Sequence, residues 1–144
     1  EWHQDFGYWH NYGLLAPTLL SIYIALDESN RENGCLQVLT GSHNLGRLNH
    51  IRENDQTVID GEYLEEAVNR HSAEYVEMGE GDALVFHCNL LHRSDANLSQ
   101  KHRWGYIASY NAVSNKPFKK VRDYGHFQKM HMVKSGQFME HSEL

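Results

Sequence analysis

Three potential metal ligands, far apart along the chain, place the strongest constraint on how it can fold. His3 and Asp5 lie at the start of the sequence, and His92 follows 89 residues after His3. Because a β-strand has a period of two, His3 and Asp5 on one strand would project from the same face, where His92 could join them. Two imidazoles and one carboxylate leave half of a metal's coordination sphere open, as oxygen-activating iron enzymes require. Arg103, 11 residues after His92, could then pair with the carboxylate of an organic acid bound to the metal.

The size and charge of the chain fit one domain that acts on a small molecule. Its 144 residues can bury about two-thirds of the unfolded surface but leave no room for a second domain, so we expect a single domain over residues 1–144. The net charge of −6 comes without a long basic run, which argues against binding to nucleic acid. No apolar stretch approaches the ~20 residues that a membrane span needs.

The cysteines and the first residue add two expectations. Cys35 and Cys88 lie in apolar runs and form no CxxC pair, so we expect reduced core thiols in a reducing, cytoplasmic compartment. The chain begins at Glu1, without an initiator Met and in what we interpret as the middle of a strand. We therefore expect the sequence to be a fragment of a longer protein.

Short alternating segments predict a mainly β structure. Residues 18–27 alternate, so that one face of the predicted strand is aliphatic and the other carries both apolar and polar side chains. Asn33-Gly34 predicts a tight turn into a strand over 35–39. Two further strands, 73–78 and 83–88, flank a glycine-rich turn.

The remaining segments complete the predicted fold. Residues 103–110 alternate so that Arg103 shares a face with small and aliphatic residues, which suits a barrel interior. Asp60 can cap a short helix with Leu64, Ala67, Val68 and His71 on one stripe, whereas the polar residues 44–60 predict an excursion from the sheet. Many short strands and one helix favour an all-β antiparallel barrel or jelly roll over an α/β fold.

Four segments resemble the phytanoyl-CoA dioxygenase family of iron(II)- and 2-oxoglutarate-dependent oxygenases. They are WHQDFGYWH at the start, ENGCLQVLTGSH at 32–43, GDALVFHCNLLHRS at 81–94 and HRWGYIASYN at 102–111. Within the family, the chain is most similar to proline-hydroxylase-like and ectoine-hydroxylase-like members, which act on small zwitterionic molecules. The resemblance implies a double-stranded β-helix, cupin-like, that lacks the N-terminal segment usual in the family.

The resemblance also implies the metal ligands. It assigns iron to His3, Asp5 and His92. His87 competes with His92 in the same segment, but it lies within the apolar strand and lacks both the serine two residues later and the arginine eleven residues later. An aspartate at position 5 favours hydroxylation, because related halogenases have a small residue there that admits chloride.

Four more residues receive cosubstrate roles from the resemblance. Arg103 and Ser94 would hold the distal carboxylate of 2-oxoglutarate, and Tyr23 would lie beside the cosubstrate. Gln4 would join the cofactor-binding residues, although strand alternation directs it away from the metal face.

The expected function is therefore hydroxylation of a small, amino-acid-like molecule with Fe(2+), 2-oxoglutarate and O2. The alternative is a cupin-like metal- or ligand-binding module without turnover, which would not need the carboxylate clamp of Arg103 and Ser94. An acyl-CoA substrate is disfavoured, because coenzyme A phosphates call for clustered Lys and Arg. We expect the aromatic residues Phe6, Tyr8, Trp9 and Tyr12 near the proximal ligands to belong to the core, with some of them lining the pocket mouth.

Overall fold

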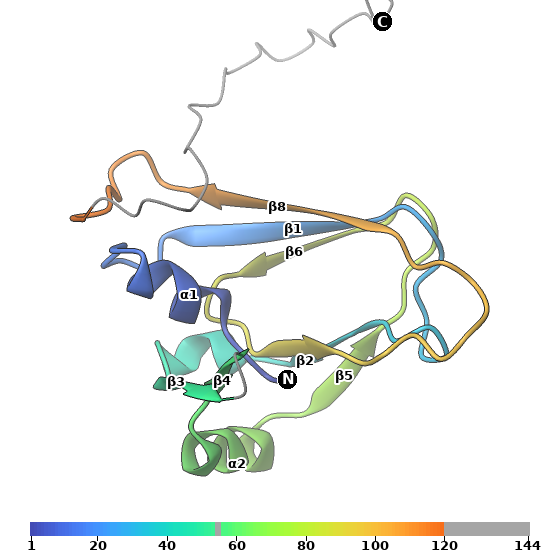
Figure 1. Ribbon diagram of the computed structural model, residues 1–144, viewed down its shortest axis with the longest axis horizontal. Helices are drawn as coiled ribbons and strands as arrows, with labels where there is room; N and C mark the ends of the chain where they lie inside the picture. The colour runs from blue at the N-terminus through green and yellow to red at the C-terminus, as the bar shows by residue number, and fades with distance from the viewer. Residues whose placement is uncertain (54–55, 120–144) are drawn as a thin grey trace, which may run out of the picture.

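Two antiparallel three-stranded sheets lie face to face in the computed structural model (Figure 1). The sheet of order β6-β1-β8 consists of Leu19–Ala25 (β1), Ala83–His87 (β6) and Gly105–Asn111 (β8). The sheet of order β5-β2-β7 consists of Leu36–Leu39 (β2), Ala73–Val76 (β5) and His92–Ser94 (β7). The structure describes residues 1–53 and 56–119, without the side chains of residues 52, 53, 56 and 57.

Helices and a hairpin lie at one end of the two sheets (Figure 1). They are α1 (Asp5–Asn11), the 3-10 helix η1 (Ser42–Leu45), β3 (His50–Glu53) paired with β4 (Gln56–Ile59), and α2 (Gly61–Arg70). Helix α1 lies at one end of the two layers, and α2 lies at the same end, beyond the β3-β4 hairpin and beside the start of β5 (Figure 1). Among the described residues, no helix is both long enough and apolar enough to cross a membrane.

The mixed face of β1, rather than its aliphatic face, points into the molecule. Leu19, Ser21, Tyr23 and Ala25 are buried, whereas Leu20 on the opposite face is 38% exposed. Ser21 lies opposite Phe86 of β6 on one side and opposite Ser109 of β8 on the other. The pairing therefore brings serine hydroxyls into the space between the sheets.

The predicted helix after Asp60 is confirmed, although its buried face is narrower than expected. The Asp60 side chain accepts a hydrogen bond from the Glu62 backbone N–H, as an N-cap does. Ala67 belongs to a core cluster on the outer side of β2 and the partly buried Leu64 packs against that cluster, while Val68 is 43% exposed. That cluster contains Trp2, Leu39, Ile59, Ala67 and Leu91.

The segment that carries His3 and Asp5 is not one strand, so that prediction is wrong in part. His3 forms a single antiparallel bridge with His92, and α1 begins at Asp5. Phe6 helps to turn the chain inward, because its N–H donates to the Cys88 carbonyl at 2.9 Å and its side chain is buried beside Leu14. The two potential ligands still converge, because Gln4 between them keeps an extended backbone.

The other predicted elements occur close to their expected bounds. The strands β1, β2, β5, β6 and β8 lie within their predicted ranges or differ from them by one or two residues; β8 begins at Gly105, so Arg103 precedes it. Residues 44–60 leave both sheets as expected, but they also form the β3-β4 hairpin, which their composition did not predict. Cys35 and Cys88 are free and buried, and burial raises the pKa of both thiols. Residues from 120 onward, for which the sequence predicts no element, lie outside the described residues.

Candidate metal centre

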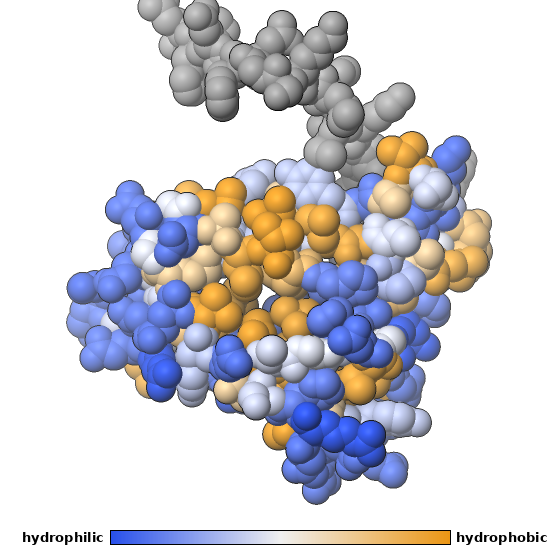
Figure 2. All heavy atoms as spheres, turned by 180° about the vertical axis from the view of Figure 1, so that it is seen from behind, coloured by the Kyte–Doolittle hydropathy of each residue, from blue (hydrophilic) through white to orange (hydrophobic). Residues whose placement is uncertain are grey.

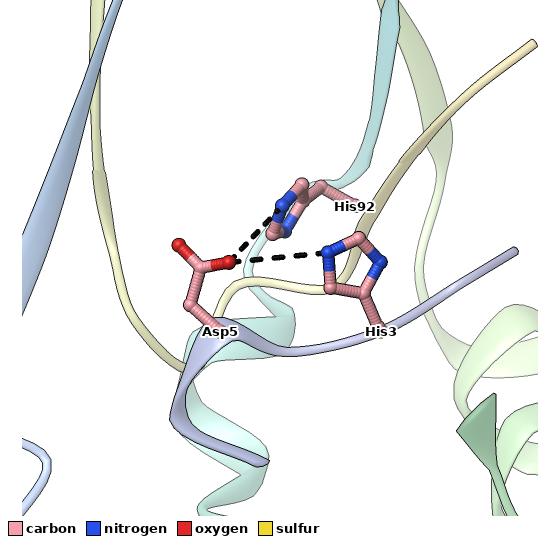
Figure 3. A group of neighbouring side chains, drawn as sticks. All are labelled: His3, Asp5 and His92. Atoms are coloured by element: carbon pink, nitrogen blue, oxygen red, sulfur yellow. Dashed lines mark ion pairs between the residues drawn. The ribbon is translucent and has the colours of Figure 1, made fainter. Parts of the chain in front are cut away.

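His3, Asp5 and His92 meet at one end of the space between the sheets. The Asp5 Oδ1 atom lies 3.6 Å from His92 Nε2 and 3.9 Å from His3 Nε2, and one potential ligand atom from each residue falls within 4.8 Å of the others (Figure 3). Reciprocal 3.1 Å hydrogen bonds between the backbones of His3 and His92 fix the two histidines side by side. Asp5 is the first residue of α1, and His92 is the first residue of β7. His3 lies beside His92 because of the bridge between them.

Both imidazoles present the nitrogen that a metal needs. His3 Nδ1 lies 3.0 Å from the Glu1 carbonyl oxygen, and His92 Nδ1 lies 3.0 Å from the Leu90 carbonyl oxygen. A carbonyl oxygen can only accept a hydrogen bond, so each Nδ1 carries the proton and each Nε2 keeps its lone pair toward Asp5. This donor set fits iron(II), which two histidines and one carboxylate bind on one face.

The charge state of His3 suits the same role. Burial, and after it the neighbouring His92, lower the pKa of His3 to about 4, although the Glu1 carbonyl and Asp5 act in the opposite direction. His3 is therefore neutral near pH 7, which is the form that binds metal ions.

The Asp5 carboxylate also accepts a hydrogen bond from a hydroxyl group, through the oxygen that is not the one nearest the histidines. Ser21 Oγ donates to Asp5 Oδ2 at 2.6 Å, and Ser109 Oγ lies 3.1 Å from Ser21 Oγ. With Oδ2 engaged, Oδ1 faces the two histidines. Neither serine was predicted as a site residue; the available signal was that Ser21 lies on the mixed face of β1 and that Ser109 shares the predicted inner face with Arg103.

A pocket of about 290 Å³ opens beside the cluster. Besides the three potential ligands it is lined by Tyr8, Trp9, Leu36, Phe86, Arg93, Ser94, Ile107 and Ser109. The ring of Phe86 meets His92 edge to face, with the ring centroids 4.9 Å apart. From behind, hydrophobic residues gather around an opening in the middle of the molecule (Figure 2). Tyr8 and Trp9 thus line the pocket, while Trp9 also packs against the core cluster that contains Phe6 and Leu14.

The predicted cosubstrate residues differ in whether they line this pocket. Ser94 lines it, whereas Arg103 and Tyr23 do not. Arg103 Nε donates to the Asn33 carbonyl oxygen at 2.8 Å. Tyr23 is 5% exposed, and its ring packs directly against Gly105, where a Cβ atom would clash with it.

Gln4 points away from the pocket, as its alternation with His3 and Asp5 indicated. Its side chain is completely buried, donates to the carbonyl oxygens of Gly46 and Asn89 at 2.8 Å each, and accepts from the Leu48 N–H at 2.9 Å. This geometry gives no support to a cosubstrate contact. Gln4 instead ties the segment of the potential ligands to two neighbouring loops.

His87 lies outside the cluster, although it is close to His92 in sequence. It is exposed at the end of β6, opposite Leu20 on the outer face of that sheet, and its Nδ1 accepts a hydrogen bond from the Asn89 N–H. The structure therefore brings His92, and not His87, to His3 and Asp5.

Comparison with known proteins assigns the chain to a family. The two facing sheets with a His-Asp-His cluster between them define a double-stranded β-helix with a potential metal centre. Residues 1–105 match the family described as Phytanoyl-CoA dioxygenase (PhyH). The chain belongs to this family.

Two curated relatives cover most of the chain. L-proline trans-4-hydroxylase from Streptomyces griseoviridis is 30% identical over 137 residues, which span 84% of this chain and 51% of the relative. Ectoine dioxygenase from Sphingopyxis alaskensis is 34% identical over 132 residues, which span 81% of this chain and 43% of the relative. The chain thus spans about half the length of the curated relatives that it matches.

Solved structures give the same result for the fold. EctD from S. alaskensis with bound Fe superposes with a TM-score of 0.70 at 34% identity, over 83% of this chain and 41% of that one. The same protein with 2-oxoglutarate and 5-hydroxyectoine gives a TM-score of 0.68 at 34% identity, over 81% of this chain and 39% of that one. The predicted double-stranded β-helix is confirmed, and the chain covers part of that fold.

Proposed function

We propose that the protein is a non-haem iron(II)- and 2-oxoglutarate-dependent dioxygenase that hydroxylates a small organic molecule. In this reaction one substrate C–H group, O2 and 2-oxoglutarate give the hydroxylated product, succinate and CO2. The observation that carries the proposal is the convergence of His3, Asp5 and His92, with both Nε2 atoms directed at Asp5 beside a pocket.

Each of the three residues has a defined task in this proposal. His3 and His92 would bind iron through Nε2, and Asp5 would bind it through Oδ1. Bound iron(II) would supply the oxygen activation that the reaction requires. The protein's own contribution is to orient the reactants and to exclude water, which the apolar walls Phe86, Leu36 and Ile107 favour.

Arg103 and Ser94 are our candidates for holding the distal carboxylate of 2-oxoglutarate. Ser94 lines the pocket, and Arg103 lies two residues before β8, where it continues the alternation of Ile107 and Ser109, two residues that line the pocket. A guanidinium has five N–H donors, so the bond from Nε to Asn33 still allows the terminal nitrogens to pair with a carboxylate.

The proposed substrate is a small amino-acid-like molecule. Proline and ectoine are the molecules named for the two curated relatives. A pocket of about 290 Å³ suits a molecule of that size beside the cosubstrate site, and its aromatic residues Tyr8 and Trp9 suit a compact cation or zwitterion. The free thiols of Cys35 and Cys88 support a reducing, cytoplasmic location as part of this proposal.

The test is a turnover assay on the full-length protein with iron(II), 2-oxoglutarate and O2. We expect succinate formation to rise with at least one member of a panel containing proline, ectoine and other small zwitterions, and to rise little with acyl-CoA thioesters. His92→Ala serves as the inactive control. Absence of succinate with every compound would contradict the oxygenase proposal and favour a binding module without turnover, whereas coupled turnover with an acyl-CoA alone would overturn only the substrate class.

A further inference from the structure

Two hydroxyl groups connect the carboxylate of Asp5 with the wall of the pocket. Ser21 Oγ lies 2.6 Å from Asp5 Oδ2 and 3.1 Å from Ser109 Oγ. Ser21 is 1% exposed, whereas Ser109 lines the pocket. The register of β1 and β8 places the two serines directly opposite each other, so the contact is built into the sheet.

The direction of the hydrogen bonds in this chain is fixed by chemistry. A carboxylate in the form that binds a metal has no proton and can only accept. Ser21 has one proton and gives it to Asp5, so its oxygen must accept the proton of Ser109. The bond to the charged Asp5 is the stronger of the two.

We propose that Ser21 is a positioning residue for the metal centre, holding Oδ2 of Asp5 so that Oδ1 alone faces the two histidines, with Ser109 fixing the orientation of the Ser21 hydroxyl. This inference deepens the proposed function, because it rests on the metal site within it. Without Ser21, the carboxylate can rotate and offer either oxygen or both. The result would be weaker metal binding and an altered coordination geometry, even where the fold is unchanged.

The test uses cobalt(II) as a probe of the site in the full-length protein. Groups that support a metal ligand from behind typically contribute 10- to 100-fold in metal affinity, so we expect Ser21→Ala to weaken cobalt(II) binding about tenfold or more. Ser109→Ala should weaken it less, because a neutral hydrogen bond is lost. Ser21→Thr restores a hydroxyl and should recover most of the affinity.

Ser29→Ala is the matched control. Ser29 is also 1% exposed, but it lies in the bridge to Met78, away from the three potential ligands. The control should bind cobalt(II) as the unchanged protein does. Thermal unfolding of each metal-free variant separates loss of the fold from loss of the site. If Ser21→Ala does not fold, the single variants Ser109→Ala and Ser21→Cys take its place in the test.

The visible absorption of bound cobalt(II) provides a readout that a merely structural role would not change. A change in the carboxylate's binding mode alters the intensity and position of the bands, so Ser21→Ala should differ from the unchanged protein even at saturating metal. Equal affinity and an equal spectrum in Ser21→Ala would overturn the inference, as would an equal loss in Ser29→Ala. Failure of the unchanged protein to bind cobalt(II) or iron(II) would instead overturn the proposed function.

Discussion

Each potential ligand side chain is held by a group that is not itself a ligand. The two histidines donate Nδ1–H to the carbonyl two residues earlier in the chain, Glu1 and Leu90, and Asp5 accepts from Ser21. The spacing of the motif predicts the ligands but not these partners. The carbonyls depend on the local backbone path, and Ser21 depends on which face of β1 turns inward.

Arg103 provides a test of the cosubstrate site at the scale of one residue. If it pairs with 2-oxoglutarate, Arg103→Ala leaves the distal carboxylate unpaired at a cost of about 2 to 5 kcal/mol, which corresponds to roughly 30-fold weaker binding or more. Arg103→Lys should recover only part of this loss, because an ammonium cannot form the bidentate fork. The 2-oxoglutarate dissociation constant, measured without oxygen, decides the point; equal affinity in Arg103→Ala and the unchanged protein contradicts the assignment.

Gln4 provides a second test, of stability rather than binding. Gln4→Leu keeps much of the volume but leaves the Leu48 N–H and the Gly46 and Asn89 carbonyl groups without their partner. Because each buried unpaired group costs about 1 to 3 kcal/mol, we expect the free energy of unfolding to fall by about 3 kcal/mol. Urea denaturation of the metal-free protein measures it. A loss below about 0.5 kcal/mol would mean that these hydrogen bonds do not hold the segment.

At the scale of elements, β3 supports the start of α1. The His50 ring accepts the Gln4 N–H at Nε2 (3.2 Å) and lies 2.9 Å from the Leu48 carbonyl at Nδ1. A Cβ atom at Gly7 would lie 2.5 Å from the same ring. The hairpin therefore fits against the one residue of α1 that has no side chain.

Gly7→Ala sets helix propensity against this close contact. Alanine favours a helix by about 1 kcal/mol over glycine. The His50 ring cannot move without losing its two hydrogen bonds. We therefore expect the cost of the clash to exceed the gain in helix propensity, so that the free energy of unfolding falls by about 1 to 3 kcal/mol. A double-mutant cycle checks the cause: in a His50→Ala background, Gly7→Ala should become neutral or stabilising. A stabilising Gly7→Ala in the presence of His50 would contradict the contact.

The sequence predicts the strands better than the segments around the site. Alternation locates β1 and β8, because half-buried strands repeat every two residues, and turn residues at their ends locate β2, β5 and β6. It does not predict α1, which has only seven residues and follows directly on an extended ligand segment, nor the β3-β4 hairpin, whose polar residues show no period. Both depend on tertiary contacts such as Phe6 with Cys88 and His50 with Gln4.

At the scale of the whole molecule, the site lies where the two sheets and α1 meet. His92 and Ser94 come from one sheet, Ser21 and Ser109 from the other, and Asp5 from the helix at their end. The three potential ligands could be predicted from sequence because their spacing is specific. The pocket walls could not, because Phe86, Leu36 and Ile107 are ordinary strand residues until the two sheets face each other.

The most direct test of this account is an anaerobic iron(II) titration of the full-length protein, with and without 2-oxoglutarate. We expect one iron per chain, and a visible charge-transfer band that appears only when both are present. His92→Ala should abolish stoichiometric binding and the band, whereas His87→Ala, on the outer face of the sheet, should leave both largely intact. Loss of iron binding in His87→Ala with retention in His92→Ala would contradict the site described here.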